Sequence, residues 1–436
     1  MAFELRELLV REDDVLPRAR YTSPEFAAAE FERLWARVWQ VACREEEIAE
    51  PGDFVEYVIG EQSVLLVRDA ADRIGAFYTS CLHRGTRLAE GAGHFDEGAV
   101  RCRYHAWRYD LDGRLVDVVD RDEFDPIPDG TCLTGVQVES WGGFVWINLD
   151  PNAPPLLDFL DPLPALLAPY HLEQMRIRSY LSTVLPANWK VVVDAFNEGY
   201  HVQGTHPQLL SWTDDVNLSY EPLGIHAHYG RLPNARRELR PSPRLGLAEG
   251  EWDEAKILVS FVEGLGGLFF EDERALVDEI ISTPMPDQSL LSRYQQGKRE
   301  LLVRRGVPVD PFSDDQLTSA DDVLFFPNMV GPIYPGSAIV FRVRPDGTNP
   351  DRAIKDTWFL EFPRPGSAGD APRKPRRRFY ADWTERDWGL ITNQDYANMA
   401  HVQTGLKTQG PSLRLNKRQE ANVLHMHRMI DRYLTD

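Results

Sequence analysis

The chain has 436 residues, 43% of them hydrophobic and 11% aromatic, which is enough for two or three domains with buried cores. Its 68 acidic residues outnumber its 48 basic residues and give a formal net charge of −20. Because nucleic-acid binding needs Lys and Arg to neutralise phosphates, this charge argues against a nucleic-acid partner. No apolar run reaches the length of a membrane-spanning helix, so we expect no membrane partner.

Four cysteines are too few for a disulfide framework in a chain of this length. The first residues, Met-Ala-Phe-Glu-Leu-Arg-Glu, lack the basic and apolar regions of a signal peptide. We therefore expect a reducing, cytoplasmic location. Cys43 and Cys132 are expected to be buried and to pack as small hydrophobic residues.

Residues 1–39 are predicted to form a polar arm followed by a helix that packs with the larger, C-terminal domain. Ser23-Pro24-Glu25 is a typical helix start, with Ser as N-cap and Pro in the first turn. Phe31, Leu34 and Val38 then recur at helical spacing, so the helix is expected over residues 24–39.

Residues 40–150 have the pattern of a compact all-β domain. Alternating or β-branched segments are separated by turn residues such as Pro51-Gly52 and Asp112-Gly113. The predicted strands are residues 54–59, 63–67, 74–78, 136–140 and 143–148. A proline-rich stretch over residues 151–169 is expected to lead out of this domain.

Two short pairs of metal-binding residues lie within this β region. They are Cys81-Leu-His83 and Cys102-Arg-Tyr-His105, separated by eighteen residues. Two Cys and two His can hold a tetrahedral zinc ion, or a [2Fe–2S] cluster in which thiolates bind one iron and imidazoles the other. The layout favours the cluster, because each loop offers one thiolate and one imidazole, whereas zinc sites more often pair Cys with Cys and His with His.

Residues 151–436 mix strand and helix patterns, which makes the whole chain α+β. Strands are predicted at residues 181–185, 325–328, 338–343 and 357–362, and helices at residues 268–281, 289–304, 384–407 and 418–434. Residues 363–378, which carry a basic run, are predicted to be an exposed loop, with a docking patch for an acidic electron donor as the alternative.

Glu198, His201 and His206 form a second candidate site in this region. A spacing of five residues would place the two imidazoles about 140° apart on a regular helix. Gly204 and Pro207 suggest a broken helix there, which could turn both rings inward. From the residues alone, a metal site and two ordinary histidines both stay open. We expect the pair His226 and His228 to be structural, and the pair His425 and His427 to lie at the surface.

These motifs resemble the large (alpha) subunit of Rieske non-haem iron oxygenases over nearly the whole chain. The cluster loops match the family's pattern, although Leu82 and Arg103 stand where Pro is common and Ala106 where Gly is common. The stretch from Asn188-Trp-Lys to His206 is similar to the segment that carries the mononuclear iron. The resemblance implies a Rieske [2Fe–2S] domain over residues 40–150. It also implies a catalytic domain over residues 151–436 with a central antiparallel sheet surrounded by helices, of the helix-grip kind.

The resemblance implies particular roles for the site residues. His201 and His206 match the iron ligands, and a carboxylate from Asp382, Asp387 or Asp395 would complete them. Asp395 is favoured because Gln394-Asp395 lies where the family has its carboxylate, although Asp395 could instead cap a helix that begins at Thr392. Glu198 matches the acid that links His201 to a cluster histidine, here His105, of a neighbouring subunit. Many ring dioxygenases have Asp at this position, whereas Glu occurs in some monooxygenases and demethylases.

The implied activity is that of a terminal oxygenase. It would use O2 and electrons from NAD(P)H, delivered by a reductase and possibly a ferredoxin, to hydroxylate an aromatic or other hydrophobic molecule. The alternative is oxidative N- or O-demethylation. A ring of three subunits, α3 or α3β3, is implied. Two other classes stay open: a pure electron-transfer Rieske protein and a zinc-stabilised binding module.

Overall fold

The computed structural model describes residues 5–11, 14–230, 239–248, 251–265, 270–283, 285, 287–363 and 375–435. The chain divides into two compact units. The large unit comprises residues 1–29, 160–371 and 376–436, and the small unit comprises residues 30–159 and 372–375. The first division falls within the helix predicted for residues 24–39. Helix α1 (Pro24–Ala29) belongs to the large unit, whereas its π-helical continuation η3 (Glu30–Trp35) belongs to the small unit.

The small unit is built from strands, as its alternating sequence predicted. Strand β3, for example, buries every second residue from Asp53 to Ile59. The strands form three sheets with the orders β10-β11-β2, β5-β4-β3-β6 and β7-β8-β9. Their bounds are β2 (Gln40–Arg44), β3 (Asp53–Ile59), β4 (Gln62–Arg68), β5 (Ile74–Tyr78), β6 (Ala92–His94), β7 (Ala99–Arg101), β8 (Arg108–Asp110), β9 (Leu115–Asp117), β10 (Gln137–Trp141) and β11 (Phe144–Asn148).

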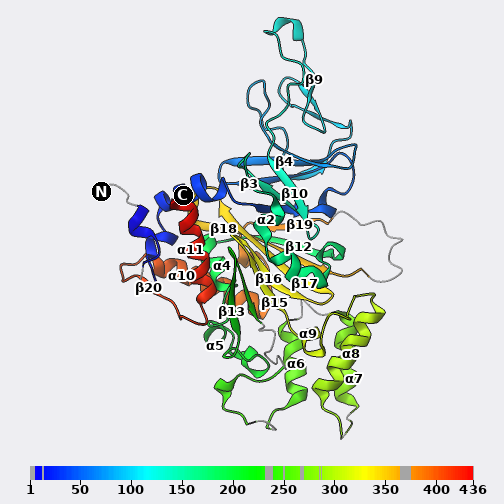
Figure 1. The fold of residues 1–436 in the computed structure, drawn as a ribbon, viewed down its shortest axis with the longest axis vertical. Coiled ribbons are helices and arrows are strands. Elements are labelled where there is room, and N and C mark those ends of the chain that lie inside the picture. The colour runs from blue at the N-terminus through cyan, green and yellow to red at the C-terminus, as the bar shows by residue number, and fades with distance from the viewer. Residues whose placement is uncertain are drawn as a thin grey trace. The chain divides into compact units, whose positions relative to one another are not determined.

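The large unit is organised around one eight-stranded sheet with the order β13-β14-β15-β16-β17-β18-β12-β19 (Figure 1). All neighbouring strands are antiparallel except β12 and β19, which are parallel. The α+β fold with a central, mostly antiparallel sheet is thereby confirmed. The strand bounds are β12 (Arg176–Leu185), β13 (Ser219–Leu223), β14 (His226–Gly230), β15 (Asp321–Phe325), β16 (Met329–Tyr334), β17 (Ser337–Asp346), β18 (Asn349–Glu361) and β19 (Arg377–Tyr380).

Helices accompany this sheet, and a short ribbon pairs β1 (Val15–Leu16) with β20 (Leu413–Arg414). Helices α7 and α8 pack side by side (Figure 1) and share an apolar core with α6. The helix bounds in the large unit are α3 (Leu163–Leu167), α4 (Trp189–Ala195), α5 (Val202–Thr205), α6 (Glu254–Gly264), α7 (Glu271–Ser282), α8 (Leu290–Arg304), α9 (Asp314–Leu317), α10 (Leu390–Leu406) and α11 (Ala421–Thr435), and α2 (Leu156–Leu160) spans the second division. None of the helices in the described part of the chain is both long and apolar enough to cross a bilayer.

Several local predictions were wrong. The strand predicted over residues 325–328 ends at Phe325, because the Phe326-Pro327 peptide begins the turn into β16. Of the loop predicted over residues 363–378, residues 364–374 lie outside the described chain, and Arg377 and Arg378 belong to β19. Cys132 is exposed rather than buried, whereas Cys43 is buried as expected.

The prediction for the first histidine pair is confirmed, and the prediction for the second pair is wrong for His427. His226 and His228 lie on one face of β14 and are structural: His226 Nδ1 accepts the backbone N–H of Phe326, and His228 Nε2 lies 3.1 Å from Asp321. His427 is fully buried, contrary to the surface position expected for it. The reason is that α11 turns its apolar face inward, which brings His427 Nε2 within 2.9 Å of the Tyr21 hydroxyl.

Candidate metal centres and substrate cavity

Two loops of the small unit present the candidate cluster ligands in the same backbone conformation. The carbonyl of Cys81 accepts the N–H of Gly85 at 2.8 Å, and the carbonyl of Cys102 accepts the N–H of Ala106 at 3.1 Å. Gly85 and Ala106 both adopt positive φ angles, +72° and +59°. The sequence spacing of each Cys/His pair is therefore built into a tight turn that holds the two side chains together.

The two thiols are buried and lie in an environment of hydrogen-bond donors. The Tyr109 hydroxyl lies 3.2 Å from Cys81 Sγ. Burial raises the pKa of the Cys81 thiol. Burial also acts against ionisation of Cys102, but hydrogen bonds from the backbone N–H groups of Tyr104 and His105 outweigh it and hold its pKa below the usual value. Such donors stabilise sulfur that carries negative charge, as in an iron–sulfur cluster.

The two imidazoles approach each other beside these thiols. The ring centroids of His83 and His105 are 4.5 Å apart, and Trp107 stacks on His83 at 5.0 Å. His105 Nδ1 is buried and has no hydrogen-bond partner among the described residues. A buried ring nitrogen without a partner costs free energy unless something binds it. Two free cysteines and this nitrogen fit a [2Fe–2S] cluster.

The sequence from His201 to His206 forms a broken helix, as the positions of Gly204 and Pro207 suggested. Helix α4 ends at Ala195, and α5 is a single turn between the two histidines. The 3-10 turn η8 (Pro207–Ser211) follows at once. This break places the two ring centroids 5.2 Å apart.

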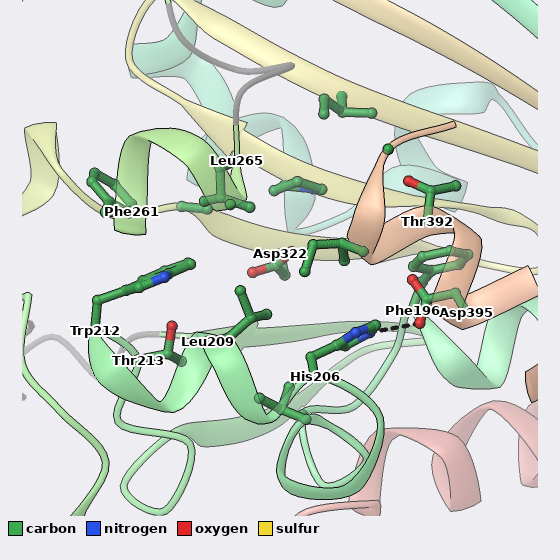
Figure 2. Close-up of a pocket in the computed structure, with 18 of the residues that line it drawn as sticks. Phe196, His206, Leu209, Trp212, Thr213, Phe261, Leu265, Asp322, Thr392 and Asp395 are labelled. Atoms are coloured by element: carbon green, nitrogen blue, oxygen red, sulfur yellow. Dashed lines mark hydrogen bonds and ion pairs between the residues drawn. The ribbon is translucent and has the colours of Figure 1, made fainter. Parts of the chain in front are cut away.

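Asp395, in the second turn of α10, faces both rings. The nearest ligand atoms of His201, His206 and Asp395 all lie within 4.8 Å of one another. Figure 2 shows His206 pointing at Asp395, with His206 Nε2 2.7 Å from Asp395 Oδ1. Helix α10 begins at Leu390 after Gly389, so Asp395 does not cap a helix that starts at Thr392.

The outer nitrogens of both rings have acceptors. Glu198 Oε1 lies 2.6 Å from His201 Nδ1, and Gln394 Oε1 lies 2.9 Å from His206 Nδ1. An Nδ1 proton donated to these acceptors would leave the Nε2 lone pair of each ring available to a metal. His206 Nε2 and Asp395 Oδ1 would then be two neighbouring ligand atoms on the same side of a bound ion. Two imidazoles and one carboxylate form the ligand set typical of mononuclear Fe(II).

The other two candidate carboxylates, Asp382 and Asp387, accept hydrogen bonds from backbone N–H groups instead. Asp382 accepts the backbone N–H of Thr384, and Asp387 accepts that of Gly389. Both are exposed. Sequence reasoning missed Gln394 as the residue that orients His206, although its place beside Asp395 was a signal. It also missed Lys355, a buried residue of β18 in the large unit, because the strand predicted over residues 357–362 begins after it.

A cavity of about 700 Å³ opens beside the three ligands in the large unit. One wall is a face of the sheet, and the helical segments η8, α6 and α10 supply others. Figure 2 shows Trp212, Phe261 and Leu265 on the side of the cavity away from Asp395. The mostly apolar lining can hold a small organic molecule and exclude water from the ligands.

Two family models match separate parts of the chain. Residues 38–128 match the Rieske [2Fe-2S] domain, and residues 171–436 match the ring hydroxylating alpha subunit (catalytic domain). The chain is 26% identical over 405 residues to the glycine betaine monooxygenase oxygenase subunit of Chromohalobacter salexigens, covering 91% of this chain and 80% of that protein. It is 33% identical over 306 residues to the anthranilate 1,2-dioxygenase large subunit of Acinetobacter baylyi, covering 66% of this chain and 60% of that protein.

The fold is also similar to a solved structure. A quaternary ammonium Rieske monooxygenase in complex with L-carnitine superposes with a TM-score of 0.66 at 18% identity, covering 99% of each chain. The family's cofactors are a Rieske [2Fe–2S] cluster and a mononuclear non-haem iron. Enzymes of this family use O2 and electrons from a reductase. With both matched regions in one chain, the protein belongs to the ring hydroxylating alpha subunit family and is the oxygenase component of a Rieske non-haem iron oxygenase.

Proposed function

We propose that this oxygenase hydroxylates a C–H bond of a small organic molecule held in the cavity beside His201, His206 and Asp395. The observation that supports this most directly is the convergence of these three ligands at the wall of a largely apolar cavity. In the proposed arrangement residues 40–150 hold the cluster through Cys81, His83, Cys102 and His105, and residues 151–436 hold the iron. When bound, the two iron centres supply electron transfer and the activation of O2.

The chain's own residues orient the ligands and the substrate. Glu198 and Gln394 hold the Nδ1 protons of His201 and His206, which fixes both rings with Nε2 toward Asp395. The apolar walls, including Trp212 in Figure 2, bind the substrate and keep bulk water out. As a further part of the proposal, Glu198 links His201 to the cluster histidine of a neighbouring subunit in a homotrimer.

The first candidate reaction is oxidative demethylation of a quaternary ammonium compound. Two relatives are named for glycine betaine and quaternary ammonium substrates. The largely apolar lining of the cavity suits the N-methyl groups of such a compound. In the balanced reaction, an N-methyl group, O2, two electrons and two protons give an N-hydroxymethyl group and water. The hydroxymethyl group then leaves as formaldehyde with release of a proton.

The second candidate is hydroxylation of an aromatic ring, which the similarity to an anthranilate dioxygenase subunit and the apolar lining favour. Glycine betaine, L-carnitine and anthranilate differ in the rest of the molecule, but each carries a carboxylate. Electrons would come from NAD(P)H through a reductase, possibly with a ferredoxin, in the cytoplasm. An accompanying β subunit, giving α3β3, is the alternative to α3.

The test is turnover of glycine betaine, L-carnitine and anthranilate by the holoenzyme with a Rieske reductase and NADH under ¹⁸O2. Formaldehyde release from the first two would support demethylation. A labelled diol or phenol from anthranilate would support ring hydroxylation. NADH oxidation that gives neither formaldehyde from the first two nor a labelled ring product from anthranilate would contradict both reactions for these substrates.

A further inference from the structure

Lys355 is a buried cation in the wall of the cavity, and the proposed mechanism does not use it. It lies on β18, where Lys355, Thr357 and Phe359 alternate with Asp356 and Trp358. The first three face the cavity, because successive residues of a strand point to opposite sides of the sheet. Lys355 is 2% exposed. Its ammonium group is therefore at the cavity surface but shielded from bulk water.

The ammonium group contacts other residues of the cavity wall. Nζ donates hydrogen bonds to Thr357 Oγ1 and to Tyr396 Oη, each at 3.2 Å. It also lies 3.6 Å from the ring centroid of Phe341 and 4.9 Å from that of Phe196. These groups are uncharged, so they hold the ammonium group in place without neutralising it.

Lys355 has no ion pair with any carboxylate in the described part of the chain. Asp356 is on the opposite face of β18 and pairs with Arg342 and Arg377. By contrast, the buried Lys298 pairs with Glu273. Buried cations are usually paired, and an unpaired one costs free energy. Accordingly, burial lowers the pKa of Lys355 to about 7, although Asp395 and Asp356 oppose the shift.

We propose that Lys355 binds the carboxylate of the substrate and thereby selects carboxylate-bearing molecules for this cavity. The inference rests on the proposed function, because it takes the cavity as the substrate site. The ammonium group has a third hydrogen to donate beyond Thr357 and Tyr396. A substrate carboxylate would supply the missing counter-charge, and the body of the substrate would lie against the apolar walls. Tyr396 follows Asp395 in α10, so this anchor would hold the substrate close to the iron ligands.

One other cation of the cavity wall is a competing anchor. Arg386 forms no ion pair among the described residues, and its Nε is buried without a partner. It is less enclosed than Lys355, and its guanidinium group packs on Tyr380 and Trp388. Arg240, by contrast, already pairs with Asp214. A variant of Arg386 is thus the matched control for Lys355.

The test is calorimetric titration of the iron-loaded holoenzyme with two matched pairs of probes. Anthranilate is paired with anthranilamide, and glycine betaine with choline, so that in each pair only the first member carries a carboxylate. A charged hydrogen bond in a shielded site predicts that at least one carboxylate binds about tenfold or more tightly than its partner. Lys355→Met should remove this difference and leave the affinities for anthranilamide and choline unchanged. Arg386→Met should retain the difference.

A purely structural role for Lys355 predicts a different pattern. Lys355→Met would then lower the thermal midpoint and weaken both members of each pair equally, which would overturn the proposal. Equal binding of both members by the unmodified enzyme, loss of the difference in Arg386→Met alone, or no binding of either carboxylate would also overturn it. Failure of the proposed function looks different: a carboxylate would bind through Lys355, but no oxygenated product would form from it.

Discussion

Both oxygens of the Glu198 carboxylate are bound to a single residue, His201. Oε1 lies 2.6 Å from His201 Nδ1, and Oε2 accepts the backbone N–H of the same residue at 3.0 Å. Glu198 is 7% exposed, so these bonds are shielded from water. The carboxylate thus fixes the position, the tautomer and the charge environment of one candidate iron ligand.

Replacing this carboxylate by an amide should separate its charge from its shape. Glu198→Gln keeps an oxygen that can accept from Nδ1 but removes the negative charge. We expect iron and sulfide per chain to stay unchanged, while steady-state turnover falls by about 10- to 100-fold or more. The measurements are metal analysis and substrate-dependent O2 consumption. Glu300→Gln, an exposed glutamate on α8, is the control, and unchanged turnover in Glu198→Gln would rule out the linking role.

The assignment of the third iron ligand can be tested by metal content alone. Asp395→Ala should lower the iron content from about three to about two atoms per chain and leave sulfide at about two. Asp387 is an exposed carboxylate that accepts hydrogen bonds from Gly389 and Asn393. Asp387→Ala should therefore keep the iron content at about three atoms per chain. The reduced cluster should give the same EPR spectrum in both variants. Loss of iron in Asp387→Ala but not in Asp395→Ala would reverse the assignment.

The two cluster loops differ at one backbone position with positive φ. Ala106 adopts φ of +59°, whereas Gly85 occupies the matching place in the other loop at +72°. The left-handed conformation costs a residue with a Cβ about 1 kcal/mol, and glycine tolerates it. Ala106→Gly should therefore raise the stability of the folded loop by about 0.5 to 1 kcal/mol, seen as a higher midpoint temperature for loss of the visible absorption of the cluster.

The reverse change is the matched control for this argument. Around Gly85, the nearest atom to a new Cβ would be Ser80 Oγ at 3.7 Å, so there is room for a methyl group. Gly85→Ala should consequently lower the same midpoint through backbone strain alone, by an amount that corresponds to about 1 kcal/mol. A lower midpoint in both variants would contradict the explanation from φ.

Asp356 is a buried carboxylate of β18 that forms ion pairs with arginines of the large sheet. Arg342 lies 2.6 Å from it, Arg377 3.1 Å and Arg344 3.6 Å. Burial opposes ionisation, but these guanidinium groups, Arg342 foremost, hold the pKa of Asp356 well below its ordinary value. Removing one partner of a buried network leaves the others uncompensated. Asp356→Asn should therefore lower the free energy of unfolding by about 3 kcal/mol, measured by urea denaturation at pH 7.

The pH dependence of this effect has a definite sign. The folded-state pKa lies below the unfolded value of about 3.9, so the ionised Asp356 contributes stability above that value. As the pH falls below about 4, the unfolded chain takes up the proton first and this contribution decreases. The difference in unfolding free energy between the native chain and Asp356→Asn should shrink over this range. A difference that grows on acidification would contradict the ion-pair explanation.

The sequence by itself determined those features whose chemistry is local. The spacing of Cys81 with His83 and of Cys102 with His105 sets two short turns, and turns are decided by neighbouring residues. The alternation along β3 predicted a half-buried strand for the same reason. Gly204 and Pro207 signalled a break in the helix before the structure showed α5 as a single turn.

The tertiary structure decided what depends on contacts between distant residues. Asp395 lies 189 positions after His206, and three carboxylates were candidates until α10 brought one of them to the rings. His427 looked like a surface residue, but packing of α11 buried it against Tyr21. Lys355 had no sequence signal, because it precedes the strand predicted over residues 357–362 and because local alternation does not report which wall of a cavity a strand forms. Long-range packing determines the burial and the charge environment of a residue, and the local spacing of residue types in the sequence predicts neither.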